Sequence, residues 1–74
     1  MITPAQCRAA RGLLKWTQTE LAAAAGVAWS TVRDFEAERR KPIRRNMEAI
    51  TGALEAAGVE FTNGDEPGVK LRRC

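Results

Sequence analysis

The sequence contains no histidine and no tyrosine, and only two cysteines, two tryptophans and two phenylalanines. Histidine is the commonest metal ligand and a frequent general base. Without it, and without cysteines at ligand spacing, we expect no metal site. Neither Cys7 nor Cys74 has a base beside it, no glycine-rich phosphate loop occurs, and so short a chain has little room for a deep pocket. These absences argue against an enzyme and against a bound cofactor.

Long apolar runs are also missing. No stretch approaches the roughly 20 apolar residues that span a bilayer, and the first residues lack the cationic flank and apolar run of a signal peptide. We therefore expect a cytoplasmic protein with reduced thiols. Two cysteines make no disulfide framework, and Cys74 follows Arg72 and Arg73 in what we interpret as a frayed tail.

What the chain does contain is one domain's length and an excess of positive charge. A domain of 74 residues has a small core, so its stability is marginal unless a partner subunit helps. Twelve Lys and Arg against nine Asp and Glu give a net charge of +3 and a pI of about 9.4. Nucleic-acid-binding domains typically carry such a net positive charge, but many small basic proteins bind no nucleic acid. The placement of the cations is therefore more informative than their sum.

Two helix starts can be recognised in the first third of the chain. Thr3-Pro4 predicts the first, because Thr caps helices and Pro is tolerated at the first helical position. This helix is expected to run to about Leu14. Four of its apolar residues are expected to face inward: Ala9, Ala10, Leu13 and Leu14. Thr17 and Glu20 have the spacing of a capping box and predict a second helix, which ends at Gly26.

Two further helices are predicted in the middle of the chain. The third covers about residues 28–38 or 39, with Val32 and Phe35 on its inner side. Pro42 prevents helix through the basic run before it. The fourth ends at Gly58 and has an apolar seam at alternating four- and three-residue steps. The seam consists of Ile43, Met47, Ile50, Leu54 and Ala57.

The C-terminal part changes to a period of two. Residues 59–62 and 69–72 alternate apolar and polar, and the segment 63–68 between them is rich in turn-forming residues. This pattern predicts a β-hairpin. An isolated hairpin is barely stable in water, so we expect it to pack on the helices or on a second copy of the chain. We divide the chain into a helical unit, residues 1–58, and a hairpin tail, residues 59–74.

Residues 11–42 contain several short motifs that identify a protein family only when they are taken together. These motifs are Arg11, Trp16-Thr17-Gln18, Glu20-Leu21-Ala22, Gly26-Val27, Thr31-Val32, Phe35-Glu36 and Arg39-x-Lys41-Pro42. In these motifs the chain resembles the phage Cro/repressor-type (XRE-like) helix-turn-helix domains, and the resemblance extends to about Gly58. It implies a mostly α fold, a four-helix repressor-like helix-turn-helix domain, which the predicted C-terminal β-hairpin follows.

The resemblance also implies which residues meet DNA. In this family the Gln that opens the second helix contacts a phosphate, and Gln18 stands there; a role in capping alone is the alternative. The third helix of the family enters the major groove. Its base-contacting positions correspond to Trp29, Ser30, Arg33 and Asp34. Thr31 is expected to contact a phosphate or a methyl group.

The chemistry of these side chains leaves alternatives open. The fork of Arg33 can pair with O6 and N7 of guanine, or it can pair within its own helix. Trp29 can pack on thymine methyl groups or fold back onto the core. Asp34 can accept from cytosine N4, hold Arg33 in place, or stay solvated. Ser30 can contact a base edge or a phosphate.

Five cations occur within seven residues directly after the third helix. They are Arg39, Arg40, Lys41, Arg44 and Arg45. In the family this loop lies along the sugar–phosphate backbone, where each neutralised phosphate releases counterions; an ordinary solvated loop is the alternative. By the same resemblance, Arg11 pairs with Glu36 and braces the first helix against the third, and Trp16 belongs to the core.

Two residues depart from the family pattern. Ala28 stands where Ser or Thr often caps the third helix, the one that reads the bases in this family. The missing cap costs roughly 1 kcal/mol. Glu38 stands where a Gly often follows that helix. We therefore expect the reading helix to end later or more loosely than usual.

The sequence favours a sequence-specific binder of double-stranded DNA, a small transcriptional regulator that acts as a repressor. We expect a homodimer on a palindromic operator, because one such domain covers only a half-site. The hairpin and the fourth helix are candidate dimer surfaces, and an edge strand such as 69–72 could pair with its copy. The alternative is a protein-interaction module, such as an antitoxin-like protein that holds a partner through Trp29, Asp34 and Glu38.

Overall fold

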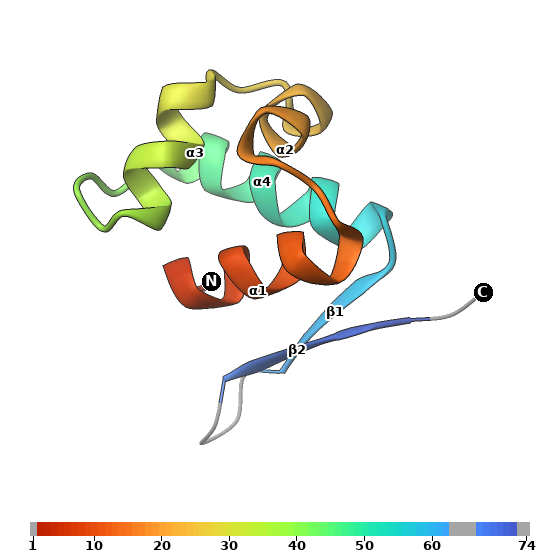
Figure 1. Ribbon diagram of the computed structural model, residues 1–74. Helices are drawn as coiled ribbons and strands as arrows, with labels where there is room; N and C mark the ends of the chain where they lie inside the picture. Colours follow the sequence, from red (N-terminus) through yellow and green to blue (C-terminus); the bar gives the residue numbers. More distant parts are fainter. Residues whose placement is uncertain (1, 63–66, 73–74) are drawn as a thin grey trace.

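The computed structural model describes residues 2–62 and 67–72, and within these residues four helices are followed by one antiparallel hairpin. The elements are α1 (Pro4–Leu14), α2 (Gln18–Ala25), α3 (Trp29–Glu36), α4 (Arg44–Ala56), β1 (Val59–Thr62) and β2 (Gly68–Leu71) (Figure 1). This arrangement confirms the predicted mostly α fold with a C-terminal hairpin. None of these helices is long and apolar enough to cross a membrane.

The starts of α1 and α2 are fixed by the predicted capping residues. Thr3 Oγ1 accepts from the Gln6 backbone N–H at 3.1 Å, and the Gln6 side chain accepts from the Thr3 N–H at 2.9 Å. Thr17 and Glu20 form the same reciprocal pair at 3.1 and 2.8 Å. Ala28, in contrast, precedes α3 without a side-chain hydrogen bond. Two of the first three helices therefore begin with satisfied backbone donors, and the third does not.

The end of α3 differs from the expectation. The helix ends at Glu36, and Glu38 adopts a left-handed conformation with φ 59°. The Glu38 N–H donates to the Phe35 carbonyl at 3.0 Å, and the Arg39 N–H donates to the Asp34 carbonyl at 2.9 Å. This Schellman pattern is the one that Gly usually adopts. The expected later end was wrong, because these hydrogen bonds outweigh the left-handed strain of roughly 1–2 kcal/mol.

The hydrophobic core lies between the four helices and the start of the hairpin. Its buried members are Ile2, Cys7, Ala10, Leu21, Ala22, Val32, Phe35, Met47, Ile50, Leu54 and Val59. Trp16 packs against this cluster and is half-buried, as expected of a core residue. In the predicted α4 seam, Ile43 alone is exposed, at 65%, because it precedes the helix as its N-cap residue.

The buried face of α1 was partly mispredicted. Ala10 is buried and Leu14 is half-buried, but Ala9 and Leu13 are exposed. The inward positions one turn earlier belong to Gln6 and Cys7. A polar residue that faces inward hides the apolar stripe from a count of hydrophobic residues.

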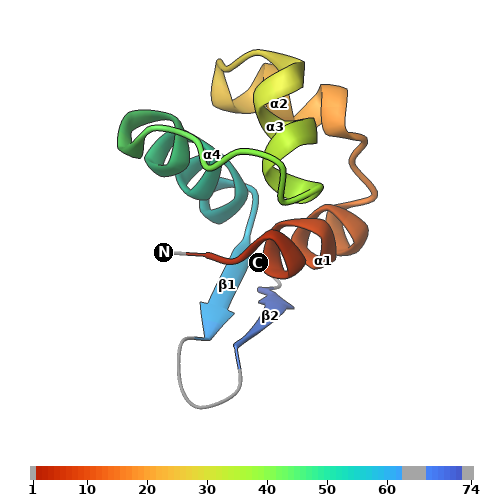
Figure 2. The same cartoon turned by 90° about the vertical axis from the view of Figure 1, so that its left-hand side faces the viewer.

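The buried Gln6 side chain explains why the hairpin packs on α1. Gln6 Nε2 donates to the Thr62 carbonyl at 3.2 Å and to the Gly68 carbonyl at 3.1 Å. Thr62 and Gly68 are partners in the hairpin register, which also pairs Phe61 with Val69. The hairpin thus packs on the helices, and α1 lies between it and the α2–α3 pair (Figures 1 and 2). Most of the predicted turn, residues 63–66, lies outside the described residues, as does Cys74.

The left-handed Glu38 gives a stability prediction. Glu38→Gly is expected to raise the free energy of unfolding by about 1 kcal/mol, because glycine adopts this conformation without a Cβ clash. Urea denaturation measures the change. Glu38→Ala is the control, since it removes the carboxylate and keeps the Cβ. Equal stabilisation by Ala and Gly would mean that the charge of Glu38, and not its backbone, is the source of strain.

Candidate nucleic-acid interface

The turn between α2 and α3 leaves one face of α3 on the outside of the molecule. Gly26 ends α2 in the left-handed conformation at φ 70°, as predicted. The inner face of α3 is buried through Val32, Phe35 and Glu36. The other face consists of the exposed or half-buried Trp29, Ser30, Thr31, Arg33 and Asp34. We call these five residues the outer face of α3.

Three side chains of the outer face interact with one another. The Arg33 guanidinium carbon lies 4.7 Å from the centre of the Trp29 ring. Arg33 Nε also donates to Asp34 Oδ1 at 3.1 Å. Trp29 is 47% exposed and therefore does not fold back onto the core. Arg33 pairs within its own helix, with Asp34. Holding Arg33 in place is one of the roles considered above for that carboxylate.

The loop after α3 brings several cations beside this outer face. Ser30, Thr31 and Asp34 line an open hollow together with Arg40, Lys41 and other residues of the segment 40–46. Arg39 lies with Arg40 and Lys41 around a second hollow, floored by buried apolar side chains. Arg44 and Arg45 are exposed at the start of α4, and Arg44 Nε lies 3.4 Å from Glu48 Oε2. Two of the predicted base-reading residues, Ser30 and Asp34, are thus neighbours of two predicted phosphate-binding residues, Arg40 and Lys41.

Gln18 has a partner within the protein. It is the first residue of α2, where Thr17 provides the cap, and its Nε2 donates to Glu36 Oε1 at 3.0 Å. A side-chain amide nitrogen carries two N–H donors, and this bond uses one of them. The predicted phosphate contact of Gln18 therefore depends on its second N–H.

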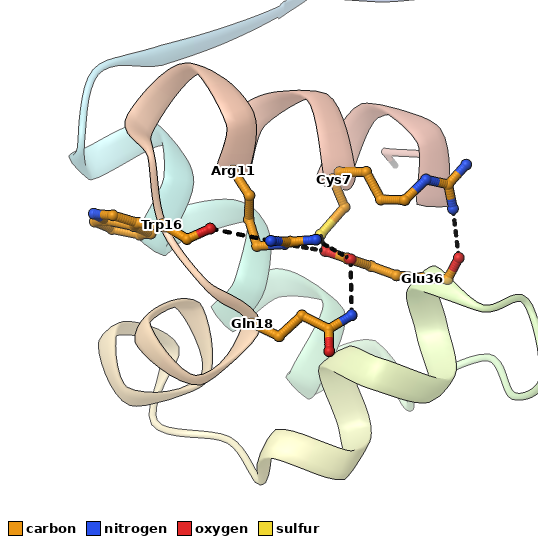
Figure 3. A network of polar contacts seen from close by, with 6 residues as sticks. Cys7, Arg11, Trp16, Gln18 and Glu36 are labelled. Carbon is orange, nitrogen blue, oxygen red and sulfur yellow. Dashed lines mark hydrogen bonds and ion pairs between the residues drawn. The ribbon is translucent and has the colours of Figure 1, made fainter.

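The carboxylate of Glu36 receives donors from three other side chains (Figure 3). Arg11 forms a bidentate ion pair with it, at 2.7 Å from Nε and 2.6 Å from Nη2. Cys7 Sγ donates to Oε2 at 3.1 Å, and Gln18 donates to Oε1. The Glu36 side chain is only 2% exposed. The predicted Arg11–Glu36 brace between α1 and α3 is confirmed, and the Gln18 hydrogen bond joins α2 to it.

Sequence reasoning missed Cys7 in this network. Cys7 precedes Arg11 by one helical turn, so both side chains lie on the same face of α1. That spacing is the signal that could have placed its thiol beside Glu36. Arg8 also reaches α3, where it donates to the backbone carbonyl of Glu36. Arg11 further donates to the Trp16 carbonyl at 3.0 Å, which ties the segment before α2 to α1.

The network shifts the pKa values of its carboxyl group and its thiol in opposite directions. Burial alone would raise the pKa of Glu36, but hydrogen bonds from Arg11, Gln18 and Cys7, with the charge of Arg11, hold it below its ordinary value. Burial, followed by the hydrogen bond to Glu36 and the charge of that carboxylate, raises the pKa of Cys7. The thiol therefore stays protonated and acts as a neutral donor to the carboxylate.

The lowered pKa of Glu36 gives a pH prediction. Its charge stabilises the fold above the ordinary carboxyl pKa, and this contribution is lost as the pH falls through the lowered folded pKa. Glu36→Gln should therefore cost about 3 kcal/mol at pH 7, and progressively less in acid. Urea denaturation of both proteins across pH measures the difference. A gap that persists unchanged at the lowest pH would mean that the carboxylate charge is not what stabilises the fold.

A comparison with known families agrees with this geometry. A family model described as Helix-turn-helix (HTH_3) matches residues 8–57, more than half of the chain, and includes all four helices in whole or in part. It leaves the hairpin out, as the resemblance in the sequence did. A search of curated proteins returned no match. The chain therefore belongs to the Cro/repressor-type helix-turn-helix family, whose members are DNA-binding transcriptional regulators.

Proposed function

We propose that the protein binds double-stranded DNA in a sequence-specific manner, with α3 in the major groove, and acts as a repressor in the cytoplasm. The observation that carries the proposal is the outer face of α3, whose Ser30 and Asp34 line one hollow with the exposed loop cations Arg40 and Lys41. Base-reading groups and phosphate-binding groups must meet the same stretch of duplex. A protein bound to this duplex would block the access of other proteins to the same DNA, and such blocking can repress transcription.

Each residue of the interface has a role that fits its chemistry. Arg33 would read guanine through O6 and N7, because the forked guanidinium matches both acceptors. Ser30 and Thr31 would contact base edges or phosphates beside it. The cations that follow α3 would contact phosphates: Arg39, Arg40, Lys41 and Arg44. Gln18 would add a phosphate contact at the start of α2 through its second N–H, while Glu36 holds the first.

Two copies of the protein would bind a palindromic operator. A single reading helix covers only a half-site, and half-sites lie about 34–36 Å apart, one turn of the duplex. Among the residues that the structure describes, α4 has no large exposed apolar side chain, whereas Leu13 of α1 and Leu71 of β2 are both exposed. The hairpin also lies away from α2 and α3 (Figure 2). We therefore favour the hairpin as the dimer surface.

The alternative of a protein-interaction module would use the same outer face. Trp29 supports it, because an exposed indole is typical of protein interfaces. Asp34 would give such an interface a negative charge, but its carboxylate is paired with Arg33. Affinity for duplex DNA that falls steeply with salt would argue against this alternative, because phosphate neutralisation produces that dependence.

The direct test is selection from a randomised duplex pool at about physiological salt, followed by sequencing. We expect an enriched palindrome whose half-site spacing reports the dimer. Enrichment of no sequence, with weak and uniform binding, would overturn the proposal and favour the interaction module.

Two arginine variants separate base reading from phosphate binding. Arg33→Ala should cost about 1–3 kcal/mol of binding free energy and relax specificity at one base pair of each half-site. Arg40→Ala should weaken binding to all sequences alike and reduce the slope of log K against log salt by about 1 per half-site. Fluorescence anisotropy on the selected operator and its single-base variants measures both effects. Equal losses on every sequence for both variants would contradict the assignment of Arg33.

The dimer surface is tested with two exposed aliphatic residues. Leu71→Ser, in the hairpin, should weaken self-association in sedimentation, because it removes apolar surface that is 42% exposed in one subunit. Ile43→Ser is the matched control, since Ile43 is exposed beside the loop cations and away from the hairpin. A dimer that Leu71→Ser leaves intact, or that Ile43→Ser disrupts, would place the interface elsewhere.

A further inference from the structure

We propose that Trp29 and Arg33 act as one unit that reads two neighbouring base pairs: a guanine, and the C5-methyl group of a pyrimidine next to it. The operator then contains thymine beside the guanine that Arg33 reads, and 5-methylcytosine can replace that thymine while unmethylated cytosine cannot. The inference rests on the proposed function, in which α3 lies in the major groove.

The first observation is the stacking of the two side chains. Trp29 and Arg33 are four residues apart and so lie one turn apart on the same face of α3. The guanidinium carbon is 4.7 Å from the indole centre, which is a cation–π contact. The Trp29 residue is 47% exposed and the Arg33 side chain is 42% exposed. The stack therefore faces outward as one surface, with one cationic part and one apolar part.

The second observation is that Arg33 is held on two sides. Asp34 accepts from its Nε at 3.1 Å, and the indole lies against the guanidinium. Within residues 2–62 and 67–72, neither Nη atom has a hydrogen-bond partner. These two nitrogens form the fork that pairs with O6 and N7 of guanine. Asp34 and Trp29 thus fix the orientation of a guanine-reading fork before DNA arrives.

The spacing determines what the indole meets. When the guanidinium lies level with a guanine edge, the centre of the indole lies 4.7 Å from the guanidinium carbon, somewhat more than the roughly 3.4 Å between adjacent bases along a strand. The indole then faces the next base pair. In the major groove, the apolar feature that a base pair presents is the C5-methyl group of thymine; cytosine presents an amino group without a methyl. An apolar ring at this position therefore favours a methylated pyrimidine.

The test uses the selected operator, in which one chemical group of one base is changed at a time. Each thymine is replaced in turn by uracil, which removes only the methyl group. With the wild-type protein, one thymine beside the Arg33-dependent guanine should lose roughly fourfold in affinity, the loss expected for one buried methyl group. Cytosine there should weaken binding by about the same fourfold, and 5-methylcytosine should restore it. Uracil at thymines elsewhere in the site is the matched control.

Trp29→Ala identifies the indole as the reader. Trp29 is exposed and outside the core cluster, so the variant should fold, and circular dichroism checks this. In this variant the uracil substitution should have no effect, measured at low salt where phosphate contacts keep the complex formed. An equal uracil effect in Trp29→Ala and wild type, or no uracil effect in wild type, would overturn the inference.

The outcome separates this inference from the proposed function. If no Arg33-dependent site can be selected at all, the proposed DNA-reading role fails, and the inference with it. If such a site exists but methyl removal beside its guanine changes nothing, only the reading by Trp29 fails. Undiminished DNA affinity of Trp29→Ala for every sequence would also overturn the inference, and would favour a protein partner for the indole.

Discussion

The arrangement of the first three helices depends on one buried carboxylate. Glu36 lies at the end of α3 with its side chain almost completely buried, and it would be destabilising there without compensation. Arg11 and Cys7 of α1 and Gln18 of α2 supply that compensation by hydrogen bonds. Because a bidentate ion pair tolerates little displacement, Glu36 sets how α3 sits against α1 and α2. The apolar core supplies the driving force, and the carboxylate supplies the geometry.

This geometry matters for the interface because every proposed DNA contact is placed relative to α3. The outer face of α3, the start of α2 at Gln18 and the loop that follows α3 must meet one duplex together. Gln18 shows the link most directly, since one amide group joins the buried network at Glu36 and also lies at the helix start proposed for phosphate. On the outer face of α3, Asp34 and Trp29 fix the orientation of the Arg33 guanidinium.

Much of this structure follows from local rules in the sequence. The capping pairs and Gly26 mark the helix limits because their chemistry acts within a few residues. The resemblance supplied the Arg11–Glu36 pair, which spans 25 residues and follows from no local pattern. The inward positions of Gln6 and Cys7 were missed, because each is buried by a long-range partner, the hairpin carbonyls for Gln6 and Glu36 for Cys7. The Arg33–Trp29 stack was not predicted either, because rotamers decide it.

Methylation interference measures whether Arg33 reads guanine from the major groove. Dimethyl sulfate methylates guanine at N7 in the major groove and adenine at N3 in the minor groove. We expect one guanine in each half-site whose N7 methylation prevents binding of the wild-type protein, and no added effect of that methylation on Arg33→Ala. Interference confined to adenine N3, or guanine interference that persists unchanged in Arg33→Ala, would mean that Arg33 does not read guanine.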